Sequence, residues 1–594
     1  MNERNPFIVK RGFRNFFSAT IILALVEQIC QILDMILAGH FVSADAFAAL
    51  ELVLPYESLI TALLTLLIGG AGVIASQFIG EQEFDRSNKA LSNTLILSLV
   101  ATSTVALISL IFLNPLIRFL CADPELAGYI REYMIIYIPT LPLIAAYTAL
   151  SEIINVDGKP EVATFAVILS CAADILLDII LMGMYDLGVA GIAIATLFSY
   201  VIPVLVFAIY LLSKRCSFKF IFRIREIFAD LKYILKSGVP YSMPFLLTSV
   251  FCLIFNWAAL HALGQEGVYA WGVGYQIMSI GIMLIDSICG TILVTMGSML
   301  HGCGDNDGLG ILAERCLIFC AISVAAVIIP VLLFPGAIAS LFGEDSADIL
   351  HASRCPIMLS VTFLIPYTLC CLKVYLAQAL SRSRLSSIPM LILFPLTYFF
   401  ILIFAFFIPE HLFLSLPAAG IVYLSLDYIN SSLVRKKHPD WVRFFLIPPS
   451  ENIRSMYISI PYTKDGLNNS LRQLEAFLDE SSLPPSLSYG INICSEELLM
   501  NIVEHNGHGR EDYFFDFSVM EDKDCVKVVV KDAGRPFNPV RNFKKTAAEA
   551  YLDGENMHLS LQILNSMCKE LSYNYMYGQN TIYMSFPKEH SGQS

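Results

Sequence analysis

The feature that most constrains this chain is a series of long apolar stretches that fills its first three quarters. A helix needs about 20 apolar residues to cross a hydrocarbon core of about 30 Å, and helices satisfy their own backbone hydrogen bonds there. The sequence predicts twelve such spans, at residues 16–38, 51–74, 92–113, 129–151, 162–183, 188–212, 239–262, 269–295, 312–334, 355–380, 387–407 and 411–433. We therefore expect an all-α polytopic membrane domain.

Charge is concentrated in the last quarter of the chain. The 594 residues are 56% hydrophobic and 15% charged, with a mean hydropathy of +0.65, which is not the composition of a soluble globular protein. From Glu451 to the end, however, the sequence holds 13 Lys and Arg and 20 Asp and Glu. This change predicts a hydrophilic domain at residues 451–594, joined to the membrane part by a linker at residues 436–450.

The loops between the predicted spans differ in positive charge. Basic residues gather in loops of one parity: Lys10, Arg11 and Arg14 before the first span, Lys214, Arg215, Lys219, Arg223, Arg225, Lys232 and Lys236 in the central loop, and Arg435, Lys436 and Lys437 after the last span. The other loops carry only Arg118, Arg131 and Arg354. The positive-inside rule then places both termini in the cytoplasm, where the tail meets ATP. The net charge of −13 and the absence of a basic, aromatic-rich cluster predict no nucleic acid partner.

The two halves of the apolar part repeat each other. Aligning Gly80 with Gly302 gives an offset of 302 − 80 = 222 residues, and the same offset brings Asp34 onto Asn256. Six spans per copy give both copies the same orientation, with a cavity expected between them. We therefore predict two lobes, at residues 1–215 and 216–435.

Three segments carry a family resemblance: "ILDMILAGHFVSADAFAAL", "GGAGVIASQFIGEQEFDRSNKAL" and "NVDGKPEVATFAVILSCAADILLDIILMGMYDLGVAGIAIATLFSY". They resemble the MATE (multidrug and toxic compound extrusion) transporters, over about residues 10–435. The resemblance implies a V-shaped protein of the cell membrane. Such a protein exports a small organic solute, of cationic or amphipathic character, in exchange for H⁺ or Na⁺ by alternating access.

Carboxylates inside spans are functional candidates on energetic grounds, because an ionised group in lipid costs several kcal/mol unless it is solvated or paired. Asp34 lies midway along the first span, and Asp174 and Asp178 lie one helical turn apart in the fifth, on one face. Two like charges so close are suited to hold a proton or Na⁺ between them. A role as helix caps or packed polar contacts is the alternative. Four further acids lie nearer helix ends or lack motif support, and we expect them to be solvated rather than functional: Asp286, Glu51, Glu57 and Glu152.

The resemblance adds residue roles to this group. The MATE branch that couples through its N-terminal lobe has an aspartate on span 1, an Asn and an Asp one turn apart on span 5, and a Thr on span 6. Asp34, Asp178 and Thr196 match this set, whereas Asp174 stands where the family has Asn. The extra carboxylate leaves the choice between H⁺ and Na⁺ open.

Helix-like and strand-like segments alternate in the tail. A strand is predicted in "YISIPYT", followed by helices at about 466–481 and 486–506. Strands in "DYFFDFSVM" and "DCVKVVVKD" come next, then a third helix near 557–571 and two last strands in "LSYNYMYG" and "TIYMSFP". This order predicts an α/β two-layer sandwich with helices on one face of a mixed sheet. On the second helix, Glu497, Asn501 and Glu504 form a polar stripe opposite an apolar one.

The polar stripe and the following "VKDAGRPFNPV" resemble Bergerat-fold GHKL ATPases, and most of all the anti-sigma-factor serine kinases. The resemblance implies that the tail binds ATP with Mg²⁺. By position, Glu497 would be the catalytic base, while Asn501 would hold Mg²⁺ against the phosphates. The further nucleotide-binding residues would be His505, Asp532, Gly534 and Thr581.

One departure from the GHKL pattern bears on activity. The lid glycines of the family are replaced by His558 and Ser560, and side chains there would weaken the grip on phosphate. Three hypotheses therefore remain. The chain is a cation-coupled exporter whose tail senses ATP or phosphorylates a cytoplasmic partner, such as an anti-anti-sigma-like protein; or it is a membrane ligand sensor whose tail is a signalling kinase; or it is an exporter whose inactive tail serves for docking.

Overall fold

The structure is a computed structural model. It describes residues 5–72, 74–75, 84–121, 123–157, 160–213, 216, 218–221, 231–302, 305–342, 346–380, 382, 387–439, 447, 454–481, 483–506, 513–521, 524–534, 568, 570–576 and 579–588. The chain divides into two compact units. One unit joins Met1–Thr20, Thr291–Cys316 and Ser431–Ser594, and the other joins Ile21–Gly290 and Leu317–Asn430.

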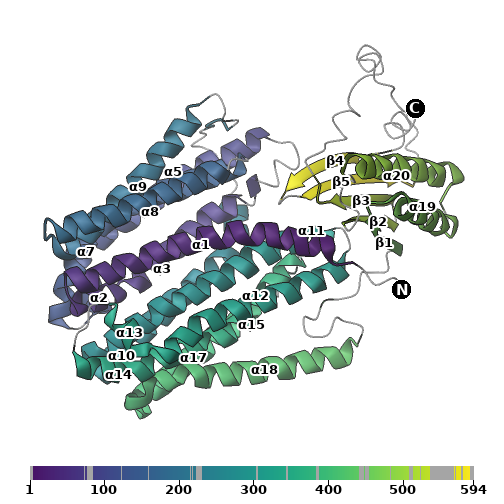
Figure 1. Cartoon of the computed structure of the whole chain (residues 1–594). Coiled ribbons are helices and arrows are strands. Elements are labelled where there is room, and N and C mark those ends of the chain that lie inside the picture. Colours follow the sequence, from purple (N-terminus) through teal and green to yellow (C-terminus); the bar gives the residue numbers. More distant parts are fainter. Residues whose placement is uncertain are drawn as a thin grey trace. The chain divides into compact units, whose positions relative to one another are not determined.

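All the regular secondary structure that is described up to residue 437 is helical (Figure 1). They are α1 (Phe7–Phe41), α2 (Ala44–Glu51), α3 (Leu54–Leu64), η1 (Thr65–Gly69), α5 (Phe84–Ile111), α6 (Leu113–Leu120), α7 (Pro124–Val156), α8 (Pro160–Gly183), α9 (Gly188–Leu211), α10 (Leu231–Asp286), η3 (Ser287–Leu293), α11 (Val294–Gly302), α12 (Asn306–Leu333), α13 (Pro335–Ser340), α14 (Ala347–Ser360), η4 (Val361–Phe363), α15 (Leu364–Ala379), α17 (Ile388–Phe407), η5 (Pro409–Leu414) and α18 (Ser415–Lys437). The predicted all-α membrane domain is confirmed.

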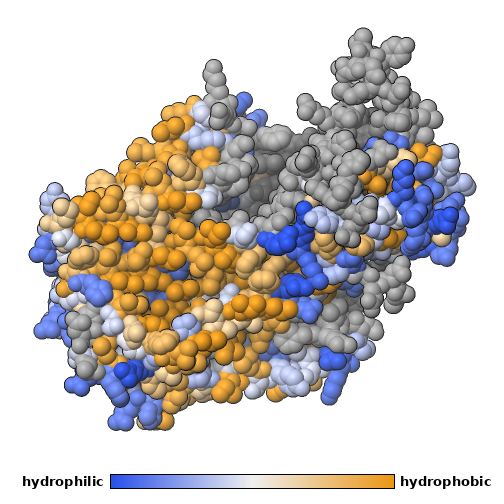
Figure 2. Space-filling view, viewed as in Figure 1, coloured by the Kyte–Doolittle hydropathy of each residue, from blue (hydrophilic) through white to orange (hydrophobic). Residues whose placement is uncertain are grey.

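Eleven helices in the described residues are long and apolar enough to cross a membrane. One of them, Tyr241–Leu293, has 53 residues, or about 80 Å of helix, which is far more than one crossing needs. Its backbone breaks at Gly264, where φ is 69° and ψ is −154°. The seventh and eighth predicted spans lie on the two sides of this break, so the eleven helices account for the twelve predicted spans. Figure 2 shows the apolar side chains that cover the outside of these helices.

The structure repeats one unusual backbone feature at the offset found in the sequence. The π-helix η1 begins at Thr65 and the π-helix η3 begins at Ser287, and 287 − 65 = 222. π-Helices, whose hydrogen bonds join residues five apart, are rare in proteins. Those that occur often lie at functional sites. Their recurrence at equivalent positions indicates that the two copies share a local backbone geometry as well as a sequence pattern.

Two glycines allow α10 to approach η1 at backbone distance. A Cβ atom added to Gly238 would lie 1.9 Å from the carbonyl oxygen of Leu66, and one added to Gly70 would lie 2.2 Å from that of Ile234. Small residues of this kind let the backbones of membrane helices approach closely. Such close packing matters in lipid, because lipid supplies no hydrophobic force to hold helices together.

We predict that Gly238→Ala lowers the free energy of unfolding by about 2–3 kcal/mol, because the backbone must move apart to admit the methyl group. Gly128→Ala is the matched control: no atom lies within 4 Å of the added Cβ in α7, so we expect no loss. Thermal unfolding of both variants in detergent measures the difference. Equal melting temperatures would show that the close contact between α10 and η1 is absent.

The tail forms a five-stranded sheet with two helices packed on it. The strands are β1 (Arg454–Pro461), β2 (Phe514–Glu521), β3 (Cys525–Asp532), β4 (Glu570–Met576) and β5 (Gln579–Pro587), in the order β1-β2-β3-β5-β4. Every pair is antiparallel, so the prediction of a mixed sheet was wrong. The physical reason is the connections: short links join β2 to β3 and β4 to β5, and the two helices between β1 and β2 return the chain to the same end.

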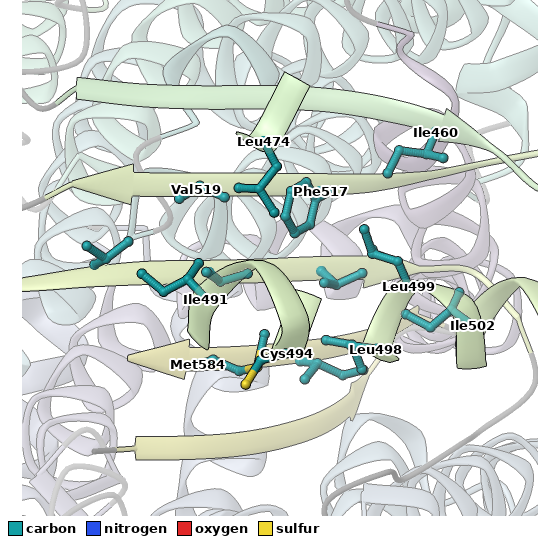
Figure 3. Packing of buried hydrophobic residues seen from close by; sticks show 14 of the residues in the cluster. Ile460, Leu474, Ile491, Cys494, Leu498, Leu499, Ile502, Phe517, Val519 and Met584 are labelled. Carbon is teal, nitrogen blue, oxygen red and sulfur yellow. The ribbon is translucent and has the colours of Figure 1, made fainter. Parts of the chain in front are cut away.

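The helices α19 (Lys464–Asp479) and α20 (Pro485–Asn506) match the predicted pair, and α20 carries the polar stripe. Its other side packs on the sheet. Ile491, Cys494 and Leu498, one helical turn apart, are buried against strand residues such as Phe517 and Met584 (Figure 3). The apolar face therefore fixes the rotation of α20 and holds its polar stripe away from the core.

Candidate functional site

Three aspartates come together on α1 and α8. The Asp34 carboxyl on α1 lies within hydrogen-bonding reach of the Asp178 carboxyl on α8, and Asp174 lies one turn before Asp178. Asp178 is 0% exposed, and neither of its oxygens has a donor among the described amide, hydroxyl and cationic groups. Ionised carboxylate oxygens only accept hydrogen bonds, so a contact between two of them requires a proton or a cation.

The hydroxyl beside Asp174 belongs to Ser199. Ser199 lies within hydrogen-bonding reach of the Asp174 side chain. Thr196 lies one turn earlier on α9, and its Oγ1 donates to the carbonyl oxygen of Ile192 at 3.0 Å. A single helix can present both hydroxyls on one side, since residues three apart are neighbours. The proposed role of Thr196 at the ion site stays a prediction. Ser199 is a residue that sequence reasoning missed.

In the tail, Asp532 is held by two donors at the end of β3. Its Oδ1 accepts from the backbone N–H of Gly534 at 3.0 Å, and its Oδ2 accepts from Asn580 Nδ2 at 2.8 Å. Asn580 Oδ1 in turn accepts from the Tyr573 hydroxyl at 2.7 Å. Strand pairing places Asn580 directly opposite Asp532, whereas the predicted Thr581 lies opposite Lys531. The direct partner of Asp532 is thus Asn580, the residue before the predicted Thr581.

Burial raises the pKa of Asp532 to about 6. The hydrogen bonds from Asn580 and Gly534 and the positive charge of Arg11 oppose this rise, since each stabilises the ionised form. Asp532 is only 2% exposed, so loss of water is the dominant effect. At neutral pH the carboxylate is mostly ionised and remains a hydrogen-bond acceptor.

The second cluster of the tail lies on α20. Asn501 Nδ2 donates to Glu497 Oε1 at 3.4 Å, and both side chains are half-buried. His505 lies one turn further along the same helix, but its side chain is outside the described residues, as are Glu504 and the lid positions His558 and Ser560. The structure thus brings together Glu497 with Asn501, and Asp532 with Gly534.

Two of the acids that we expected to be solvated, Glu51 and Asp286, lie inside the unit made of Ile21–Gly290 and Leu317–Asn430. Glu51 is 0% exposed, and its Oε1 accepts from Gln276 Nε2 at 2.5 Å. Asp286 is half-buried and accepts hydrogen bonds from the hydroxyls of Tyr367 and Tyr375 at 3.0 and 3.4 Å. The expectation of solvation was wrong because it counted distance from helix ends in the sequence. Packing of neighbouring helices over those ends has no sequence signal of its own.

Comparisons with known proteins agree with this architecture. A family model described as MatE matches residues 19–180, and one described as histidine kinase-like ATPase domain matches residues 460–586. The multidrug export protein MepA of Staphylococcus haemolyticus (strain JCSC1435) is 25% identical over 276 residues, covering 46% of this chain and 61% of that protein. MepA of Staphylococcus aureus (strain NCTC 8325 / PS 47) is 23% identical over 291 residues, covering 48% and 63%. The matches thus span less than two thirds of these relatives.

Solved structures show the same fold over a longer range. An inward-facing multidrug resistance MATE family transporter of the MOP superfamily aligns with a TM-score of 0.62 and 23% identity, over 70% of this chain and 99% of that one. An outward-facing MATE transporter aligns with a TM-score of 0.59 and 22% identity, over 73% and 99%. The chain is therefore a membrane-embedded protein with the MATE fold. More particularly, it carries a MatE domain at residues 19–180 and a histidine kinase-like ATPase domain at residues 460–586.

The pKa of Asp532 yields a prediction about stability. Because folding raises this pKa from 3.8 to about 6, the folded tail is most favoured when Asp532 is protonated. Its contribution is full below about pH 4 and is lost as the pH rises through about 6. Integrated over this window, the tail loses about 3 kcal/mol, an order-of-magnitude figure.

We expect Asp532→Asn to remove this pH dependence. The new amide can keep both contacts if Asn580 turns over, since Tyr573 then accepts instead of donating. The measurement is the urea midpoint of tail unfolding in the purified full chain, by pulse proteolysis at pH 4.5 and pH 7. The exposed Asp479→Asn on α19 is the control and should behave like the parent. A parent whose tail is equally stable at both values would contradict the assignment.

Proposed function

We propose that the protein is a proton-coupled antiporter that exports a small organic solute, with a cytoplasmic tail that binds ATP. The single observation that carries the transport proposal is the contact between the Asp34 and Asp178 carboxyls. No donor among the described residues hydrogen-bonds to either oxygen of Asp178. The relatives named above are described as multidrug exporters, which supports an organic, cationic or amphipathic substrate. For the solute, we propose only this chemical class and no particular compound.

A proton suits this site better than Na⁺. One proton between the Asp34 and Asp178 carboxyls removes a buried charge and makes a hydrogen bond with the atoms already present. Na⁺ is held through several oxygen lone pairs, as hard cations are. Here, the Asp174 carboxyl that replaces the family's Asn adds a third charge rather than a neutral ligand. Taking up the proton would remove one negative charge from the site, and giving it up would make the site more attractive to a cationic solute.

The tail residues fit an adenine nucleotide. An acceptor carboxylate with its orientation fixed, as Asp532 is by Gly534 and Asn580, is suited to the exocyclic amine of adenine. Glu497 and Asn501 sit together on α20, where Asn501 would ligate Mg²⁺ and Glu497 would orient an attacking hydroxyl. Bound ATP·Mg²⁺ would supply a phosphoryl group. We propose a regulatory or Ser/Thr-kinase-like role toward a small cytoplasmic, anti-anti-sigma-like protein.

The loop charges support the orientation. Basic residues flank the first and last spans and fill the central loop, so we propose that both termini lie in the cytoplasm, in the cell membrane. In that orientation the tail meets cellular ATP and the solute leaves toward the outside.

The transport proposal predicts that Asp34→Asn and Asp178→Asn each abolish solute flux driven by a pH gradient. Each variant replaces one carboxyl by a neutral amide, so the remaining carboxyl can no longer share a proton with a second carboxylate. The assay is ethidium flux in proteoliposomes, with the exposed Glu132→Gln on α7 as a control that should keep the parent rate. Unchanged flux in both Asp variants would overturn the coupling site, and no flux in the parent would favour the membrane-sensor hypothesis.

The nucleotide proposal predicts that Asn501→Ala weakens Mg·ATP binding about 10–100-fold, as loss of a group around a metal does. A fluorescent ATP analogue titrated into the purified full chain, with and without Mg²⁺, measures this. Asn468→Ala, an exposed asparagine on α19, should bind like the parent. If the parent binds no ATP, the docking-tail hypothesis takes the place of this one.

A further inference from the structure

Glu51 is a carboxylic acid sealed between helices of the two sequence repeats. It ends α2 in the first repeat, and its side chain meets α10 of the second. Its Oε1 accepts from Gln276 Nε2 at 2.5 Å, and its backbone carbonyl oxygen accepts from Asn256 Nδ2 at 3.1 Å. Its other carboxyl oxygen, Oε2, is buried and has no hydrogen-bond partner among the residues that the structure describes. The residue is 0% exposed, so water does not reach it in this conformation.

The Glu51 side chain packs directly against the backbone of α10. A Cβ atom on Gly272 of α10 would lie only 2.6 Å from Glu51 Cγ. The titratable groups that face the carboxyl are Glu57 on its own span and Tyr275 and Cys252 on α10, and each is neutral or negative. Within the described residues, no Lys, Arg or His contacts it. An ionised Glu51 would therefore be a buried charge without an opposite charge among the described residues, which costs several kcal/mol.

Further hydrogen bonds join the same two surfaces. Gln28 Nε2 donates to Ser279 Oγ at 2.9 Å, and Ser249 Oγ donates to the carbonyl oxygen of Pro55 at 2.6 Å. Together with the Glu51 contacts they form a polar seam between the repeats. A transporter that works by alternating access must separate its two repeats along such a seam.

We propose that Glu51 is a second proton-binding site, outside the aspartate group, and that its proton uptake closes the seam between the two repeats. Opening the seam lets water solvate Glu51, which then releases its proton as the carboxylate. Closing it requires a proton to return to a carboxylate oxygen, because the closed seam offers no charge partner. One O–H bond forms or breaks in each step, and water carries the proton.

The direction of this coupling fits an antiporter. The residue ends α2, the helix that follows the loop at residues 42–43, and the positive-inside rule places that loop outside the cell. Protons from an acidic exterior would then bind the outward-open form and favour closure on that side. This inference rests on the proposed proton-coupled transport, but the seam itself can be followed without any transported solute.

The buried thiol of Cys252 on α10 reports opening directly. The full chain in lipid nanodiscs is treated with N-ethylmaleimide across pH 5–9, and mass spectrometry gives the labelling rate of Cys252 relative to the exposed Cys355, which corrects for thiol ionisation. In the parent we expect the ratio to rise severalfold with pH. In Glu51→Gln, which is neutral at every pH, we expect a low ratio at every pH. Glu132→Gln should match the parent.

A second variant keeps the test decisive if Glu51→Gln does not fold. Gln276→Ala removes a hydrogen bond of the closed seam only, so Cys252 should become reactive at lower pH than in the parent. A ratio that does not change with pH in the parent, or equal midpoints in the parent and Gln276→Ala, would overturn the proposal. If labelling follows the prediction while ethidium flux is absent from the parent, the Glu51 site stands and the transport function fails.

Discussion

The cost of removing a carboxyl group from water is the constraint on which the rest of this structure depends. Asp34 and Asp178 lie in contact in the helical unit, and Glu51 is sealed between its two repeats. None of these acids has a basic partner among the described residues. Each can remain there only by holding a proton, by binding a cation or by meeting water when the helices move. In the transport that we propose, this cost would link proton binding to the movement of the helices.

In the tail, packing and hydrogen bonds orient the carboxyl groups of the candidate site. One side of α20 is fixed on the sheet by Ile491, Cys494 and Leu498, which leaves Glu497 and Asn501 on a polar side. Small residues at the end of β3 let the chain turn. The Asp532 carboxylate is oriented there for a donor ligand by bonds from the backbone and the neighbouring strand. The division of labour that we propose is proton-driven transport in the membrane and nucleotide recognition in the tail.

The sequence predicted the architecture well where a single residue type or period carries the signal. Long apolar runs located the spans, and the period of α20 placed Glu497 and Asn501 on one face. It failed where contacts between distant elements decide. Asn580 was missed because its pairing with Asp532 depends on strand register. Glu51 was misread because only the packing of α10 shows that it is buried. The mixed sheet was wrong because strand direction depends on how the helices return the chain.

The central claim is that the membrane half runs on its own titratable carboxyls and that the tail does not power transport. The most direct test is ethidium flux in proteoliposomes containing the full chain, compared under two conditions. With a pH gradient and no nucleotide, we predict full flux. With Mg·ATP on the tail side and no ion gradient, we predict none. Flux that requires ATP and ignores the gradient would contradict the account.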